Sequence, residues 1–151
     1  MRGPDGVHTL RHATSFRGLI VYQKARSAAA LICECSKGFP REERYALTDQ
    51  LRRSSRSIGA QIAEAWGKRR YQNHFISKLT DADAEQQETQ HWLDTSADCA
   101  YLTREETAQI VLQLEEIGRM LDSMIAKAPQ FCGSPADFVR EEHAAYFSDR
   151  R

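Results

Sequence analysis

The sequence predicts an all-α protein: an up-and-down antiparallel four-helix bundle with a short C-terminal fifth helix. First, apolar residues recur at three- and four-residue steps in four long stretches, which is the spacing of one buried helix face. Second, the period-two alternation typical of β-strands is almost absent. Four such helices with short connections are expected to pack side by side in alternating directions.

The 151-residue chain is the size of one domain. We expect residues 1–15 to form a flexible N-terminal tail, residues 16–128 the bundle, and residues 129–151 a C-terminal tail with a short helix. No apolar run approaches the ~20 residues needed to cross a bilayer. The first residues also lack the apolar segment of a secretory signal, so the expected location is cytoplasmic.

The first helix is predicted from about Phe16 to Ser36. The residues expected along its inner stripe are Phe16, Leu19, Ile20, Gln23, Ser27, Ala30 and Leu31. Gly38 is expected to end this helix because glycine readily adopts the left-handed cap conformation. Pro40 then disfavours helix at the residue before it.

The second helix is predicted from about Glu42 to Trp66. Its expected buried stripe is Leu47, Leu51, Ser54, Ile58, Ile62 and Ala65. At about 100° per residue, three arginines fall on the opposite side: Arg52, Arg53 and Arg56. Gly67 is expected to end the helix and lead into a basic elbow formed by Lys68, Arg69 and Arg70.

The third helix is predicted from near Tyr71 to about Ala100. Its expected inner stripe is Phe75, Leu79, Ala82, Gln86, Leu93 and Ala97. A buried Gln86 needs a hydrogen-bond partner, for which Gln50 and Gln61 of the preceding helix are candidates.

The fourth helix begins with a capping-box pattern, Thr103 followed three residues later by Glu106. Its expected stripe is Ile110, Leu114, Ile117, Leu121, Met124 and Ile125, and Pro129 is expected to end it. A second N-cap pattern predicts the short fifth helix from about Pro135 to Tyr146.

The formal net charge is zero, which argues against a dedicated nucleic-acid binder, because such proteins are usually basic overall. The charges are unevenly distributed, however. Residues 41–70 carry eight bases and four acids, whereas residues 81–98 carry six acids and no lysine or arginine. The two segments are expected to neutralise each other, either within a subunit or between subunits.

The sequence indicates no metal site, cofactor or catalytic residue. Ferritin-type bundles use two Glu-x-x-His motifs and two further carboxylates, whereas only one such motif, Glu88 to His91, occurs here. There is no glycine-rich phosphate loop. The four cysteines, Cys33, Cys35, Cys99 and Cys132, match no zinc or redox spacing and are expected to be reduced.

With these blocks in view, the chain resembles the bacterial four helix bundle protein family. That family includes proteins encoded in intervening sequences of large-subunit ribosomal RNA genes and the accessory variability determinant of diversity-generating retroelements. The resemblance covers about residues 16–127, and its matching segments are residues 16–25, 39–47, 50–64, 67–69, 75–79 and 88–102 and the stripe of the fourth helix. Mild departures occur at Gln61, where the family usually has Asn, and at Ala65 and Ala100, where it has Gly.

The resemblance implies a homo-oligomer, typically a ring of five bundles, with no enzymatic activity and no cofactor. The retroelement relatives bind a reverse transcriptase and nucleic acid through a basic ring surface. The function expected here is therefore a non-enzymatic interaction scaffold that assembles with itself. The alternative is a nucleic-acid-binding accessory factor to a reverse transcriptase or ribosomal RNA.

Two groups of residues are the candidates for these roles. The candidates for contact with RNA or DNA are Arg52, Arg53, Arg56, Lys68, Arg69 and Arg70. Trp66 and Tyr71 lie next to them, either to stack on bases or to pack at the end of the bundle. The candidates for a subunit interface are Gly59, Ala60 and Ala63, expected on the outward face of the second helix; the alternative is that they are short residues facing solvent.

Overall fold

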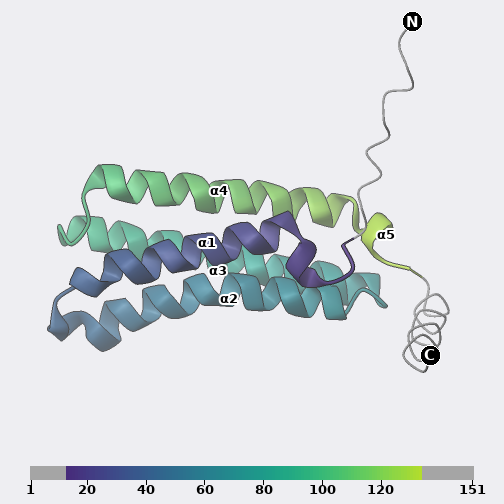
Figure 1. The fold of residues 1–151 in the computed structure, drawn as a ribbon, viewed down its shortest axis with the longest axis horizontal. Helices are drawn as coiled ribbons and strands as arrows, with labels where there is room; N and C mark the ends of the chain where they lie inside the picture. The colour runs from purple at the N-terminus through teal and green to yellow at the C-terminus, as the bar shows by residue number, and fades with distance from the viewer. Residues whose placement is uncertain (1–12, 134–151) are drawn as a thin grey trace, which may run out of the picture.

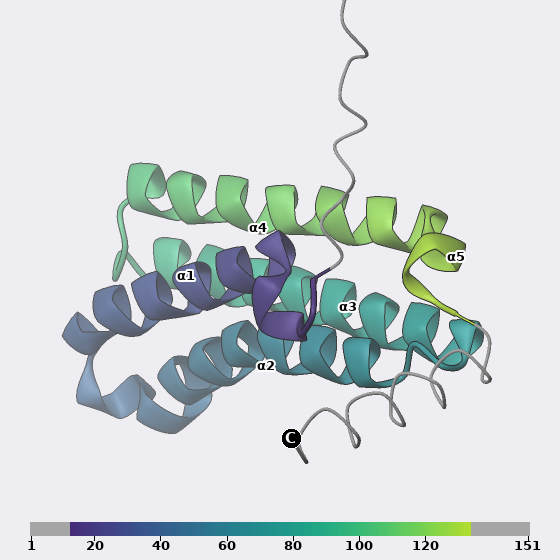
Figure 2. The ribbon, with the colours of Figure 1, turned by 45° about the vertical axis from the view of Figure 1, so that its right-hand side comes forward.

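Four long helices lie side by side in the computed structural model, which describes residues 13–133 (Figure 1). They are α1 (Ile20–Cys35), α2 (Asp49–Gly67), α3 (Gln72–Asp98) and α4 (Arg104–Ala126), followed by the one-turn α5 (Ala128–Phe131). Each helix packs on the next and α1 also packs on α4, so the four close into a bundle (Figure 2). The described residues contain no strand, and the predicted all-α bundle is confirmed.

Short helical turns precede α1 and join α1 to α2. They are η1 (Phe16–Gly18), η2 (Ser36–Gly38), η3 (Arg41–Glu43) and the π-helix η4 (Arg44–Thr48). None of the helices that the structure describes is both long and apolar enough to cross a membrane.

The first predicted helix is interrupted at Leu19, which is extended with φ −72° and ψ 126°. Ser15 caps the short η1 turn before this break, its hydroxyl accepting from the Arg17 amide at 3.2 Å. The regular helix therefore begins only at Ile20. The residues that α1 buries are Val21, Ala25, Ala28 and Ile32.

The stripe predicted for this helix is partly wrong. Leu19 is buried and Phe16 packs against the core, but Ile20 is 61% exposed and Leu31 is 40% exposed. The other members of the expected stripe are also exposed: Gln23, Ser27 and Ala30. One reason is the break at Leu19, which separates Phe16 from the helical register that begins at Ile20. The other is that the buried side of α1 contains alanines, whose small side chains indicate the direction of burial only weakly.

The stripe predicted for the second helix is confirmed, because all six of its residues are buried. The helical path begins at Arg41, passes through the η3 and η4 turns, and continues as α2 to Gly67. The predicted break at Gly67 is also confirmed, since residues 68–71 form the turn into α3.

The stripes of α3 and α4 are likewise buried, except that Ile125 is only half-buried. The capping box at the start of α4 is present. The Thr103 hydroxyl accepts from the Glu106 amide at 3.1 Å, and the Glu106 carboxylate accepts from the Thr103 amide at 2.8 Å.

Gln86 is buried, as predicted, but its partners are not the expected ones. Its side-chain amide donates to Asp83 Oδ1 at 3.0 Å, and its carbonyl accepts from Gln90 Nε2 at 2.7 Å, so both partners lie on α3. Gln50 and Gln61 instead accept from other side chains. Residues three and four apart on a helix are neighbours, and here they satisfy the amide without a second helix.

Gly118 lets α4 approach this amide closely. A Cβ at Gly118 would lie 3.0 Å from Gln86 Nε2 and 3.3 Å from Asp83 Oδ1. Gly118→Val is therefore expected to lower the free energy of unfolding by about 1–3 kcal/mol, because the buried amide must move from its partners. Gly67→Val is the matched control, since nothing lies within 4 Å of its Cβ position. Urea unfolding followed by circular dichroism measures both, and equal effects would contradict this assignment.

The described chain ends in α5, which packs against the bundle. Phe131 stacks on buried Phe75 with 5.8 Å between ring centroids, and Ala128 is fully buried. Pro129 lies inside this short turn, after α4 has ended at Ala126. The predicted helix over 135–146 and most of the predicted N-terminal tail lie outside the described residues.

Candidate interaction surfaces

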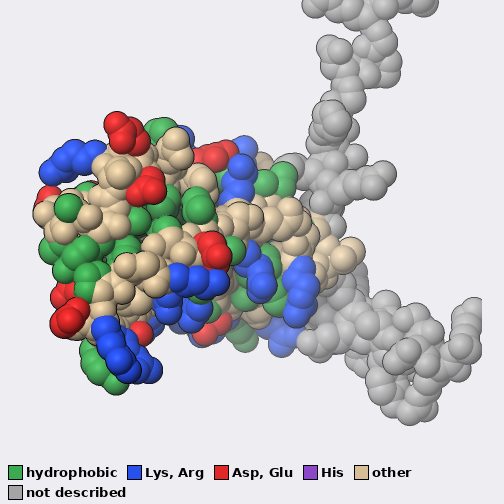
Figure 3. All heavy atoms as spheres, turned by 60° about the vertical axis from the view of Figure 1, so that its left-hand side comes forward, with side chains coloured by type: hydrophobic (Ala, Val, Ile, Leu, Met, Phe, Trp, Pro, Cys, Tyr) green, Lys and Arg blue, Asp and Glu red, His purple; other side chains and the backbone are tan. Residues whose placement is uncertain are grey.

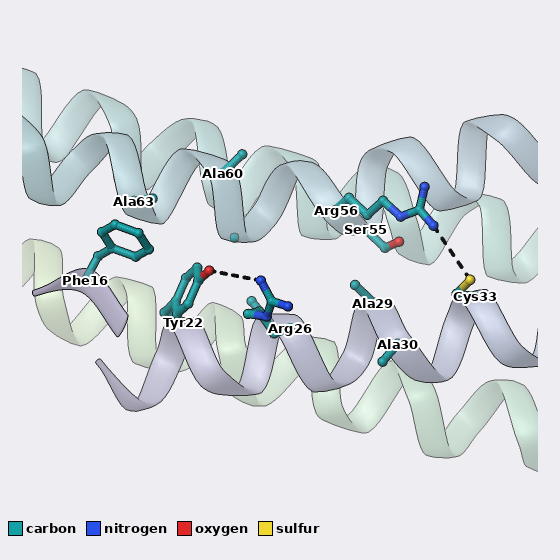
Figure 4. A pocket seen from close by; sticks show the side chains of 12 residues that line it. Phe16, Tyr22, Arg26, Ala29, Ala30, Cys33, Ser55, Arg56, Ala60 and Ala63 are labelled. Atoms are coloured by element: carbon teal, nitrogen blue, oxygen red, sulfur yellow. Dashed lines mark hydrogen bonds between the residues drawn. The ribbon is translucent and has the colours of Figure 1, made fainter. Parts of the chain in front are cut away.

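An open groove of about 570 Å³ runs between α1 and α2; we call it the α1–α2 groove (Figure 4). Five of its twelve lining residues are alanines, among them Ala29 and Ala30 from α1 and Ala60 and Ala63 from α2. Phe16 and Tyr22 line one end, and Cys33 and Ser55 line the other. The groove is apolar because the two helices face each other through short side chains.

Tyr22 forms the aromatic end of this groove. Its ring meets Phe16 edge-on, with centroids 5.0 Å apart, and its hydroxyl accepts from Arg26 Nη1 at 3.3 Å. The ring lies over α2 at Gly59, where a Cβ would be 3.5 Å from the nearest ring carbon. An alanine at position 59 would therefore meet the ring at ordinary van der Waals distance.

All three predicted interface residues line the α1–α2 groove, but they differ in burial. Ala60 is exposed and Ala63 is half-buried, and both line the α1–α2 groove. Gly59 is buried under Tyr22, so its expected position on the outward face is wrong. The sequence of α2 alone does not show that Tyr22 of α1 covers Gly59, and for this reason Gly59 was predicted on the outward face.

The three arginines of α2 differ in how strongly they are engaged. Arg52 is half-buried and reaches back to the end of α1, donating from Nε to the Ser36 hydroxyl at 2.8 Å and from Nη2 to the Cys33 carbonyl at 3.5 Å. Arg56 is exposed, and its Nη2 lies 3.6 Å from Cys33 Sγ. Arg53 is exposed as well and donates to Gln50 at 3.3 Å.

These arginines line a second open hollow on α2, of about 500 Å³, next to the α1–α2 groove. The basic elbow lies elsewhere: Lys68 is 12 residues beyond Arg56, which is about 18 Å along a helix. The six candidate nucleic-acid residues therefore form two separate groups within one subunit.

The elbow group is organised by Trp66. The Arg69 guanidinium lies 3.6 Å from the centre of the Trp66 ring, and its Nε donates to the Trp66 carbonyl at 2.9 Å. Trp66 is half-buried against the core, so packing at the end of the bundle is the alternative that the structure supports for it. Tyr71 instead is 55% exposed, with its ring beside His74.

The acidic stretch of α3 is partly neutralised within the chain. Lys78 pairs with Glu64 of α2 at 2.8 Å and with Asp81 at 3.8 Å, while Arg53 approaches Glu88 to 4.0 Å. The hydrogen bond from Lys78 lowers the pKa of the Glu64 carboxyl. Of these pairs only Arg53–Glu88 joins a base of residues 41–70 to an acid of residues 81–98. The predicted neutralisation within one subunit therefore rests on a single long, solvent-exposed and weak contact among the described ion pairs.

The carboxyl group of Glu85, on the same helix as the acidic stretch, has a raised pKa. Burial is the main cause, followed by a hydrogen bond with Glu88 and repulsion from it, while Arg53 acts in the opposite direction. A pKa raised on folding means that the group contributes stability below its unfolded pKa, and that this contribution is lost as pH rises through the folded pKa. At pH 7 an ionised Glu85 is therefore a net cost to the fold.

Glu85→Gln is accordingly expected to raise the free energy of unfolding at pH 7, and the gain should shrink as the pH falls toward 4. Urea unfolding at several pH values measures the difference between variant and parent. Glu42→Gln, the same exchange at an exposed position in η3, is the matched control for the loss of one surface carboxylate. A gain that grows toward low pH would contradict the assignment.

The Glu-x-x-His motif of α3 is used in local contacts. Glu88 accepts from Trp92 Nε1 at 3.4 Å, and the His91 ring packs on Trp92 with 4.7 Å between centroids. Within residues 13–133 no group of three or more histidine, cysteine or acidic side chains is arranged to hold a metal. All four cysteines are free thiols, and burial raises the pKa of the Cys35 thiol.

Three large apolar side chains on α1 and α4 are exposed to solvent, and the sequence analysis predicted none of them to be so. Leu112 on α4 is 63% exposed, and Ile20 and Leu31 on α1 are exposed too. Lys24 of α1 pairs with Glu116 of α4 at 3.1 Å, so the edge of α1 that carries Ile20 and Leu31 lies toward α4. We call these three residues the α1–α4 face. The sequence contained one indication of this exposed apolar group: Leu112 lies outside the predicted buried stripe of its helix.

Figure 3 shows hydrophobic side chains gathered toward the end of the bundle away from the chain termini, with basic and acidic side chains around them. The protein therefore offers two apolar surfaces, the α1–α2 groove and the α1–α4 face, both of which involve α1. Both contain charged side chains: Arg26 and Arg56 line the groove, and the Lys24–Glu116 ion pair lies on the α1–α4 face.

Comparison with known proteins agrees with this architecture. A family model described as 23S rRNA-intervening sequence protein matches residues 17–123. A crystal structure of a protein of unknown function from the S23 ribosomal protein family of Bacteroides thetaiotaomicron is 34% identical, with a TM-score of 0.64. That similarity covers 70% of this chain and 98% of the other. No curated protein matches the chain. The chain thus belongs to the 23S rRNA-intervening sequence protein family.

Proposed function

We propose that this protein is a non-enzymatic scaffold that assembles with copies of itself through the α1–α2 groove. The observation that carries the proposal is the groove itself: an open surface between two helices, walled by alanines. Small residues let another helix approach closely, and an apolar surface left in water favours association. All three predicted interface residues line this surface: Ala60 is exposed, Ala63 is half-buried and Gly59 is buried beneath Tyr22.

The two apolar surfaces favour a ring over a simple dimer. We propose a head-to-tail contact, in which the α1–α4 face of one copy enters the α1–α2 groove of the next. Such a contact needs two different apolar surfaces on each subunit. Head-to-tail contacts close into rings when the rotation between copies allows it. Five copies is the number that the family resemblance implies.

The charges of the chain are compatible with such an assembly. Arg26 and Arg56 line the groove, while Glu105 and Glu115 are exposed on α4, the helix that also carries Leu112. Opposite charges at the border of an interface fix its register and increase the rate of encounter. The net charge of zero means that copies do not repel one another as whole molecules.

Co-expression of two differently tagged copies tests the proposal. Purification through one tag should recover the other copy in comparable amount, and high salt should not remove it, because the contact is mainly apolar. A tagged variant with Ala60→Glu should fail to recover its partner. Recovery of only the tagged copy by the unaltered protein would contradict self-assembly.

A second candidate function is that of a nucleic-acid-binding accessory factor, acting with a reverse transcriptase or ribosomal RNA. The hollow lined by Arg52, Arg53 and Arg56 favours it, because exposed guanidinium groups bind phosphate. In a ring the hollow would repeat around the axis, and weak contacts would add by avidity.

Gel retardation with single- and double-stranded nucleic acid at two salt concentrations tests this second candidate. Affinity should fall steeply with salt and fall further in Arg53→Gln, whereas Arg119→Gln, the same exchange at an exposed position on α4, should leave it unchanged. Absence of binding at low salt, or binding indifferent to salt, would remove the nucleic-acid role.

A further inference from the structure

We propose that the part of α4 that enters the α1–α2 groove of a second copy is one row of three residues, Ala108, Leu112 and Glu115. The inference rests on the proposed self-assembly and deepens it, because it names the side chains that meet and the direction in which the two helices run. Leu112 is its starting point. This side chain is 63% exposed on a helix whose other large aliphatic side chains are buried or half-buried.

The α4 row lies on one outward side of its helix. Ala108, Leu112 and Glu115 are spaced by four and then three residues, so they project in the same direction, and all three are exposed. Glu116, the next acid, pairs with Lys24 of α1 at 3.1 Å. The α4 row therefore presents, in chain order, a small side chain, a large apolar side chain and a carboxylate.

The α2 wall of the groove contains a row of the same length. Arg56, Ala60 and Ala63 are also spaced by four and three residues, and all of them line the groove. Arg56 and Ala60 are exposed, and Ala63 is half-buried. Each row spans seven residues, which is about 10.5 Å along a helix. The α2 row presents, in chain order, a guanidinium group and then two small side chains.

The two rows match when the helices run in opposite directions. With Leu112 of one copy placed over Ala60 of the other, Glu115 lies about 4.5 Å along the axis and Arg56 about 6 Å in the same direction. At the other end Ala108 comes opposite Ala63, where two small side chains let the helices approach closely. A parallel arrangement would instead place the Glu115 carboxylate toward Ala63 and away from the arginine.

The two surfaces are also complementary in charge beyond this one pair. The described residues that line the groove include two arginines, Arg26 and Arg56, and no acid. From Glu105 to Glu116, α4 carries four acids and no lysine or arginine. A second copy of α4 therefore fits the groove in charge as well as in shape, and such complementarity selects one register and one direction of the contact.

Charge reversal on both sides of the contact tests the inference in the full chain. Arg56→Glu and Glu115→Arg should each raise the dissociation constant of the assembly by about ten-fold or more, because like charges would then face each other. Both changes in one chain should return it to within about three-fold of the parent value. Asp94→Arg, a charge reversal at an exposed position on α3, should leave it unchanged. Sedimentation velocity over a concentration series measures all four variants.

A mixing experiment tests the place of Leu112. Leu112→Asp and Ala60→Glu should each remain monomeric where the parent assembles, because one removes the apolar anchor and the other fills the groove. In an equal mixture, the intact α4 row of Ala60→Glu should enter the intact groove of Leu112→Asp and give a complex of two chains. Thermal unfolding checks that both variants are folded, as expected for exposed positions.

Three results would overturn the inference and leave self-assembly standing. In each of them the parent assembles, and either the double charge reversal stays as weak as the single ones, Leu112→Asp assembles like the parent, or the equal mixture gives no complex. A parent protein with the mass of one chain at every concentration would instead contradict the scaffold proposal, and with it the inference that rests on it.

Discussion

Ala60→Glu is expected to weaken the association of copies by at least 100-fold. The alanine side chain is exposed and lines the α1–α2 groove, so the change leaves the isolated bundle intact. In the assembled protein the larger side chain would occupy the space that the second copy enters. Its carboxylate, four residues from Arg56, would also have to leave water together with that arginine, which costs several kcal/mol. A hundred-fold change in the dissociation constant corresponds to about 2.7 kcal/mol.

Sedimentation velocity over a concentration series measures this effect. Ala84→Glu is the matched control, because it makes the same exchange at an exposed position on α3, away from both apolar surfaces. Thermal unfolding of both variants checks that the bundle is retained. Equal weakening by the two variants, or none by Ala60→Glu, would show that the groove is not the contact between copies.

Phe75→Ala is expected to lower the free energy of unfolding by about 3–5 kcal/mol. Phe75 is fully buried at the end of the bundle, where it joins α3 to α5 through its stack on Phe131. Its loss removes a large apolar side chain and leaves a cavity that the surrounding helices fill only in part. A domain of this size has only about 5–15 kcal/mol of stability, so much of the margin would disappear.

Urea unfolding followed by circular dichroism gives the value for Phe75→Ala. Phe131→Ala is the comparison: it removes the other ring of the stack from a half-buried position and should cost about half as much or less. A loss below about 1 kcal/mol for Phe75→Ala would mean that the end of the bundle is loosely packed, in conflict with the core described above.

The sequence predicted α2, α3 and α4 well because their buried stripes contain large aliphatic or aromatic residues at a regular helical spacing. It failed on α1 for two physical reasons. The chain breaks helix at Leu19, so residues on either side do not share one register. Alanines also occur on several sides of that helix, which leaves the direction of burial to tertiary packing rather than to periodicity.

The candidate surfaces were harder to predict, since each depends on residues from two helices. The covering of Gly59 by Tyr22 and the reach of Arg52 to Ser36 are contacts between α2 and the α1 region that no local pattern specifies. The α1–α2 groove exists only once the two alanine-rich sides face each other. Its alanines on α2 were nevertheless detectable as small residues outside the buried stripe.

The molecular mass of the full chain in solution is the most direct test of the proposed assembly. Light scattering at tens to hundreds of micromolar should give a multiple of the 17.2 kDa chain, about 86 kDa if five copies close the ring. The mass should fall toward that of one chain in Ala60→Glu at the same concentrations. A mass of one chain for the unaltered protein throughout this range would contradict the account.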